Sequence, residues 1–114
     1  MRPFSFYTDP EDQKFMTLAE VTAGVQAIKE VAQRYPKELQ IDHLTQTEIV
    51  VTGDHLTESF RFQPTVFEEG AYKGMFFLRE YNSCTTNHPR KAVLVKEMLD
   101  ALLTAVDHKL CIHG

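Results

Sequence analysis

Apolar residues recur at three- and four-residue steps in the first third of the chain, which is the spacing of one face of an α-helix. The members of this stripe are Phe15, Leu18, Val21, Val25, Ile28, Ala32 and Tyr35. Thr17 and Glu20 form a capping-box pattern, in which a hydroxyl and a carboxylate satisfy the free backbone N–H groups of a helix start. Pro36 cannot continue the helix, so the pattern predicts a helix from about Thr17 to Tyr35.

The middle of the chain has the short β-branched and aromatic segments that are typical of strands. They are TEIVVT at 47–52, TESFRF at 57–62 and AYKGMFFLREY at 71–81. The sequence GDHL at 53–56 predicts a hairpin turn in which Gly53 and Asp54 take positive φ. A second helix is predicted from about Pro89 to His108 or Lys109, with its core side formed by Val95, Met98, Leu99, Leu102, Val106 and Leu110.

The order helix, three strands, helix predicts an α+β fold of two layers, with two helices packed on one face of an antiparallel sheet of three to four strands. No internal repeat, low-complexity tract or Gly/Ser linker divides the sequence, so residues 1–114 are expected to form a single domain. Phe4 and Phe6 alternate with Ser5, which predicts a short strand or an arm against the core.

The third predicted strand is apolar on both faces. Because side chains alternate across a sheet, Tyr72, Phe76 and Leu78 point one way, and the opposite face receives Met75, Phe77 and Tyr81. Two helices cover only one face of a small sheet, so the surplus predicts contact with another chain, and a two-fold homodimer is the commonest way to hide such a patch. Tyr72, Phe76 and Leu78 are therefore the interface candidates, with Met75, Phe77 and Tyr81 taking that place if the register is inverted. The other alternative is a single core that absorbs all of these side chains.

Composition narrows the functional classes. The chain has 114 residues, of which 43% are hydrophobic and 25% charged, with a net charge of -4. The negative charge argues against a protein that mainly grips phosphate backbones, so nucleic acid is not an expected partner. We expect a cytoplasmic protein without a membrane span or signal peptide, in which the two cysteines are free thiols.

The densest group of reactive side chains is NSCTTNHPRK, at 82–91. Free amides at a helix start favour anions, so Thr86, Asn87, Arg90 and Lys91 are the anion-binding candidates. Cys84 and His88 form a candidate reactive pair, because cations and a helix start lower a thiol pKa; the alternative is an ordinary capped helix start. We assign no catalytic residue, because the sequence offers no identifiable oxyanion hole and no orienting partner for the imidazole of His88.

Metal and cofactor sites are not predicted either. The tail HKLCIHG contains His108, Cys111 and His113, but their spacing is not a recognised zinc-ligand pattern, so no metal ligand is assigned. The sequence has no P-loop and no dinucleotide-binding glycine pattern, so no cofactor is expected.

The order of elements and the segment GDHLTESF, at 53–60, resemble a double-stranded-RNA-binding domain, in which a Gly-x-x-His loop precedes a strand. The resemblance implies that His55 contacts a minor groove and that Arg90 and Lys91 meet phosphates. The chain departs from that family in having only two adjacent cations at the second helix start, a helix that is not alanine-rich, and a negative net charge.

Together these observations predict a small non-enzymatic binding, adaptor or chaperone-like protein that acts through an apolar, aromatic surface. The alternatives are an anion- or duplex-RNA-binding protein that uses the start of the last helix, and a thiol-dependent enzyme that uses Cys84 and His88.

Overall fold

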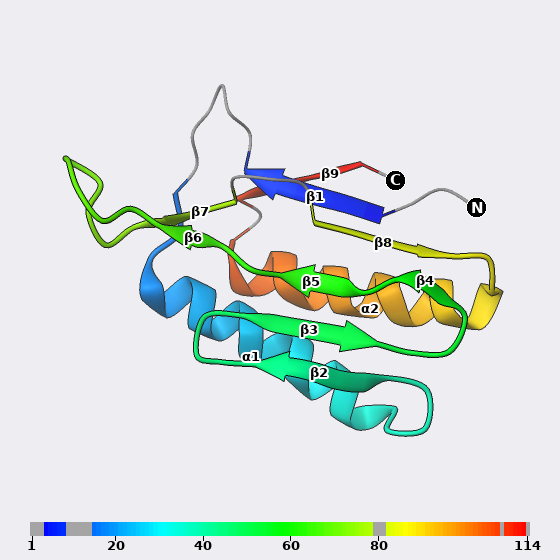
Figure 1. Ribbon diagram of the computed structural model, residues 1–114. Helices are drawn as coiled ribbons and strands as arrows, with labels where there is room; N and C mark the ends of the chain where they lie inside the picture. Colours follow the sequence, from blue (N-terminus) through cyan, green and yellow to red (C-terminus); the bar gives the residue numbers. More distant parts are fainter. Residues whose placement is uncertain (1–3, 9–14, 79–81, 108, 114) are drawn as a thin grey trace.

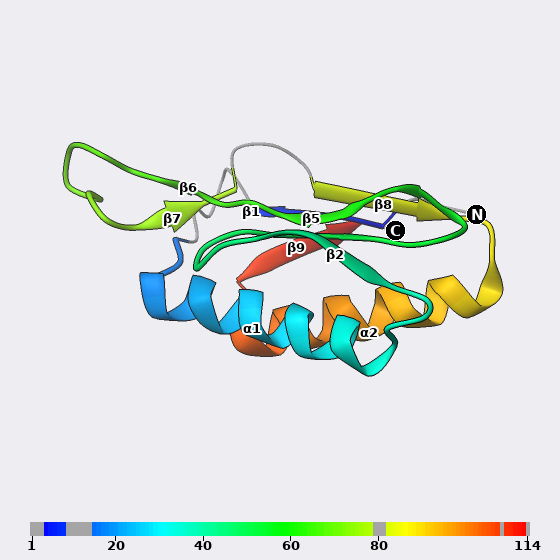
Figure 2. The same ribbon diagram turned by 60° about the horizontal axis from the view of Figure 1, so that its bottom comes forward.

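The computed structural model describes residues 4–8, 15–78, 82–107 and 109–113, with side chains described for 15–78, 86–107, 109 and 110. Two helices pack side by side on one face of a layer of antiparallel strands (Figure 1, Figure 2). The fold is therefore α+β, as the sequence predicts. Among the described residues, neither helix is long and apolar enough to cross a bilayer.

The elements follow one another as β1 (Phe4–Thr8), α1 (Leu18–Arg34), β2 (Gln40–Leu44), β3 (Ile49–Thr52), β4 (Leu56–Glu58), β5 (Phe60–Phe62), β6 (Thr65–Val66), β7 (Phe76–Phe77), β8 (Asn82–Thr86), α2 (Pro89–Ala105) and β9 (Leu110–His113). The order of one sheet is β4-β8-β1-β9, that of a second is β2-β3-β5, and β6 and β7 form a separate hairpin.

The two larger sheets are joined by one bent segment of chain. β4 and β5 are separated only by Ser59, yet β4 pairs with β8 whereas β5 pairs with β3. β8 and β9 both run antiparallel to β1, which lies between them, so α2 connects two parallel strands that flank β1. This connection places the start of α2 at the end of β8, beside β4 (Figure 1).

Helix α1 begins as its sequence predicts. Thr17 is the N-cap: its Oγ1 accepts a hydrogen bond from the Glu20 backbone N–H at 3.2 Å, and its own N–H donates to Glu20 Oε1 at 3.1 Å. The same carboxylate accepts a hydrogen bond from Lys109 Nζ at 2.8 Å, which ties the start of α1 to the segment after α2. Burial opposes ionisation of Glu20, but the bonds from Lys109 and Thr17 outweigh it and lower the pKa of this carboxyl.

The core lies between the helices and the strand layer. Its largest fully buried side chains are Phe60, Phe62, Met16, Ile28, Ile49, Leu94, Met98 and Leu102. Gly24 allows α1 to pack closely against α2 and β5. A Cβ atom at this position would lie 2.9 Å from Leu102 Cδ1 on α2 and 3.2 Å from Phe62 Cε2 on β5. The stripe predicted for α1 is buried from Val21 to Ala32 and partly buried at Tyr35, whereas Leu18 is 46% exposed and Met16, outside the stripe, is buried.

The strand predicted at 71–81 is much shorter in the structure. Residues 71–74 form a turn, and strand pairing is confined to Phe76–Phe77, with 79–81 outside the described residues. Gly70 and Gly74 both have positive φ, 87° and 88°, a conformation that glycine adopts without steric cost. Gly70, just before the predicted strand, and Gly74, within it, turn the chain back where its aromatic residues predict one continuous strand.

Candidate functional site

Two regions of the described structure are candidate sites: the start of α2, where polar side chains lie together, and the β6–β7 hairpin, where aromatic side chains lie together. The first contains most of the polar residues that the sequence singles out. β8 ends at Thr86, and α2 begins at Pro89 with His88 as its N-cap. The His88 side chain makes no capping hydrogen bond. The predicted helix start is therefore correct in position, but the His88 side chain does not provide the cap that the alternative interpretation assigns to this segment.

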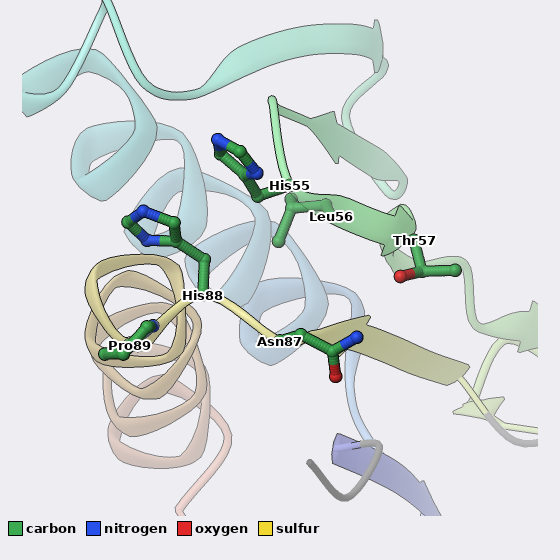
Figure 3. Close-up of a pocket in the computed structure, with 6 residues that line it drawn as sticks. All are labelled: His55, Leu56, Thr57, Asn87, His88 and Pro89. Carbon is green, nitrogen blue, oxygen red and sulfur yellow. The ribbon is translucent and has the colours of Figure 1, made fainter.

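A cavity of about 350 Å³ lies at this helix start, lined by His55, Leu56, Thr57, Asn87, His88 and Pro89 (Figure 3). The imidazole rings of His55 and His88 stack, with centroids 4.5 Å apart and planes 25° apart. In Figure 3 both rings extend to one side of the β4 and β8 segments, whereas Asn87 and Thr57 point to the other side. The polar groups of the cavity therefore do not converge on one point.

The buried hydroxyl of Thr86 fixes the histidine pair. Thr86 is fully buried, and its Oγ1 donates to the backbone carbonyl of His55 at 2.6 Å and accepts from the His88 backbone N–H at 3.1 Å. His55 has a φ of 68°, in the left-handed region that non-glycine residues rarely adopt. The predicted turn at 53–56 exists, but His55 takes the positive φ that the sequence assigns to Gly53 and Asp54.

The histidine pair is poorly arranged for a metal ion. Ring-nitrogen lone pairs lie in the imidazole plane, and two nearly parallel planes do not aim them at a common centre. Within the described part of the chain, no three His, Cys, Asp or Glu side chains are grouped to hold a metal. His88 Nδ1 is buried and has no hydrogen-bond partner there.

The predicted anion-binding cations are engaged with Glu38. Arg90 Nε and Nη2 each donate to a Glu38 carboxylate oxygen at 3.1 Å, and the guanidinium lies 5.1 Å from the centre of the Tyr35 ring. Lys91, only 5% exposed, donates from Nζ to the Glu38 backbone carbonyl at 2.9 Å. The Arg90 hydrogen bond is the main reason that the pKa of Glu38 lies below its usual value.

The four anion-binding candidates therefore differ in whether their polar groups already have partners within the protein. The Thr86 hydroxyl faces inward, and Arg90 and Lys91 are bound to Glu38, whereas Asn87 is exposed at the cavity. Cys84 lies on β8, where its backbone pairs with Phe4, but its side chain is outside the described residues. The reactive pair of Cys84 and His88 therefore stays a prediction.

The second place is a group of aromatic side chains at the β6–β7 hairpin, which among the described residues consists of Phe15, Phe67, Tyr72 and Phe77 and which we call the hairpin aromatic cluster. Phe67 stacks on Phe77 with ring centroids 4.2 Å apart, and Phe15 stacks on Tyr72 at 4.4 Å. Phe15 also meets Phe67 edge to face at 5.4 Å, which closes the group. Tyr72 is 50% exposed.

Strand register shows which side of the hairpin carries this cluster. Residues directly opposite in an antiparallel pair share a face, and successive residues alternate. Phe76 is opposite both Val66 and Met16, and it points into the core. Phe77 therefore points outward, away from the helices. Phe15 and Phe67, which neighbour Met16 and Val66 in sequence, point outward with it.

The three interface candidates from the sequence do not lie on one surface. Phe76 and Leu78 are 8% and 5% exposed and belong to the core, whereas Tyr72 is half exposed on the connecting turn. The sequence places Phe77 on the opposite face from these three, and it assigns no site to Phe15 or Phe67. The available signal was the alternation of Phe76 and Phe77, because only one of two adjacent strand residues can face the core.

Comparison of the chain with models of protein families, with curated proteins and with solved structures finds no match.

Proposed function

We propose that this chain is a small, cytoplasmic, non-enzymatic binding protein whose working surface is the hairpin aromatic cluster. The observation that carries the proposal is a group of aromatic rings on the outer face of a hairpin, joined by ring contacts in which Phe67 meets each of the other three, with the three phenylalanines partly buried and Tyr72 half exposed. A soluble protein rarely exposes a contiguous aromatic patch unless the patch meets a partner. Tyrosine and phenylalanine are also enriched at protein interfaces.

The position of the hairpin supports a binding role over a purely structural one. Both views of the molecule show the connection between β6 and β7 reaching past the start of α1, beyond the layer of helices (Figure 1, Figure 2). The core side chains lie between the helices and the main strand layer. The cluster stabilises a two-residue strand pair that would be marginal alone, and it leaves half of the Tyr72 surface exposed to solvent.

The anion alternative has less support from the geometry. Its two cations are tied to Glu38, and the remaining polar side chains at the cavity, Asn87 and Thr57, point away from the histidine pair. The same two cations are the residues that the RNA-binding resemblance requires to be free for phosphates. The thiol alternative depends on Cys84 and is tested by its alkylation rate near neutral pH, which is fast for a reactive thiol and slow for an inert one.

A peptide selection with two matched variants tests the proposal. The immobilised chain, sparse enough to stay as separate copies, is exposed to a displayed library of random peptides. Tyr72→Asp introduces charge into the cluster, and Val93→Asp does so at an equally exposed apolar residue on α2, since the two side chains are 50% and 51% exposed. We expect peptides that bind the wild type and Val93→Asp but are lost with Tyr72→Asp. Enrichment that Tyr72→Asp does not reduce would contradict the proposal, as would the absence of any enrichment.

A further inference from the structure

We propose that the partner of the hairpin aromatic cluster is a second copy of this chain, docked hairpin to hairpin about a two-fold axis. This inference rests on the proposed function, because it names the occupant of the same surface. A two-fold interface brings one patch against itself, so the patch must be complementary to its own rotated image. The requirements are an apolar centre and charges of both signs at its border.

The connection between β6 and β7 meets the charge requirement. Glu68 and Glu69 follow Phe67 in this connection, Lys73 follows Tyr72, and all three charged side chains are exposed. The connection is held in shape by backbone hydrogen bonds from Gly74 N–H to the Phe67 carbonyl and from Phe67 N–H to the Met75 carbonyl, both at 2.9 Å. Acidic and basic side chains are therefore presented from one ordered segment that borders the aromatic centre.

A two-fold arrangement pairs these opposite charges. Glu68 and Glu69 lie on one arm of the connection and Lys73 on the other, since Phe67 and Gly74 are bonded across it. The proposed register sets Lys73 of each copy against Glu68 and Glu69 of the other, and the two-fold axis makes each such contact occur twice. Such charge complementarity fixes register and disfavours wrong partners. A polyanion such as RNA meets two adjacent carboxylates beside the cluster, and a strongly basic peptide leaves Lys73 unmatched. A second copy of the chain carries both acidic and basic side chains at this border, so it matches the patch better than a partner that is wholly acidic or wholly basic.

The aromatic centre supplies the affinity in this arrangement. The most energetic residues of protein interfaces are typically aromatic or arginine side chains near the centre, surrounded by a polar border. Tyr72 has this position: its ring stacks on Phe15 on one side and half of its surface is open. A second copy covers that open half, while the Phe15 and Phe67 rings hold Tyr72 in place before docking, which reduces the entropy lost on association.

Sedimentation equilibrium over a range of concentrations tests this arrangement. We expect the wild type and Val93→Asp to reach twice 13.1 kDa, and Tyr72→Asp to weaken self-association by about thirtyfold or more, as for loss of a central interface residue. Circular dichroism confirms that each variant is folded. A wild type that stays at 13.1 kDa overturns the inference, and so does a dimer that Tyr72→Asp leaves unchanged.

A charge exchange tests the two-fold register itself. Lys73→Glu makes the border wholly acidic, and the double variant Glu68→Lys with Glu69→Lys makes it wholly basic, so each variant alone repels its own copy. Their equimolar mixture pairs an acidic border with a basic one, and we expect it to recover the dimer mass. A mixture that stays monomeric refutes the proposed register.

The outcomes separate this inference from the proposed function. A monomeric wild type that still selects peptides through Tyr72 leaves the binding role intact and refutes the second copy as partner. A dimer insensitive to Tyr72→Asp, together with a peptide selection insensitive to it, refutes both.

Discussion

Replacing Gly53 with alanine tests how tightly the turn between β3 and β4 packs against the segment after α1. A Cβ atom on Gly53 would lie 2.5 Å from the backbone carbonyl oxygen of Glu38. Contacts of real Cβ atoms essentially never fall below 3.0 Å, so the two backbone segments must separate by at least 0.5 Å, the difference between these distances. The same carbonyl accepts the hydrogen bond from the buried Lys91 Nζ, at 2.9 Å.

The expected cost follows from these contacts. Overpacking of a tight site costs about 1–3 kcal/mol. Alanine recovers about 0.4–1 kcal/mol by restricting the unfolded chain. Because the same carbonyl is displaced, the Lys91 bond stretches and loses part of the roughly 1.5–3 kcal/mol that is typical of a hydrogen bond to a charged group. We expect Gly53→Ala to lower the free energy of unfolding by about 2 kcal/mol, and the melting temperature by about 8 °C.

Urea unfolding followed by circular dichroism measures this loss, and Gly70→Ala is the matched control. Gly70 has positive φ but no heavy atom within 4 Å of an added Cβ, so alanine there introduces backbone strain without a clash and costs about 1 kcal/mol. Backbone NMR shifts distinguish the two variants, because Gly53→Ala disturbs Glu38 and Lys91 whereas Gly70→Ala disturbs only the β6–β7 hairpin. A Gly53→Ala variant as stable as the wild type would show that the approach of these segments is not a constraint.

Two further predictions concern the contacts around the start of α2. The pKa of Glu38 is lowered mainly by its hydrogen bond from Arg90. Its contribution to stability is therefore complete above the unfolded carboxyl pKa of about 4.3 and is lost as the pH falls through the lower folded value. The melting temperature should exceed that of Glu38→Gln at pH 7 and approach it near pH 3, with the exposed Glu30→Gln as control; an equal difference at both pH values contradicts this. Thr86→Val leaves the His55 carbonyl and the His88 N–H without their hydroxyl partner, which should cost about 1–3 kcal/mol in urea unfolding. Thr104→Val, which removes an exposed hydroxyl bonded within α2, should change stability by no more than about 0.5 kcal/mol, and an equal effect of the two variants refutes the role of Thr86.

The helices were predictable because their determinants are local. The Thr17–Glu20 capping box links residues three apart, and the apolar stripe that begins at Val21 repeats within single helical turns, so a short stretch of sequence contains the whole pattern. The fold class follows from the same kind of information, since two amphipathic helices and intervening strands must bury their apolar sides against one another.

Strand boundaries and the aromatic surface were less accessible from the sequence. Alternation shows that Phe76 and Phe77 face opposite sides, but only the burial of Phe76 and of Met16, with which it pairs, shows which side is the core. Two glycines convert the first part of the predicted third strand into a turn, which carries Tyr72. The cluster then forms from residues as far apart in sequence as Phe15 and Phe77.

The sequence by itself determined the two helices, most of their core faces and the α+β class, because these depend on interactions between residues within a few positions of each other. The end of α2 was predicted too late: the helix ends at Ala105, and Leu110, predicted as a core position of the helix, lies in β9. Only the tertiary structure decided which partners the polar residues at 86–91 contact. Arg90 and Lys91 meet Glu38 across 52 and 53 residues, and the Thr86 hydroxyl meets the His55 carbonyl across 31. Partners at such separations depend on how distant elements pack, and no local spacing encodes them.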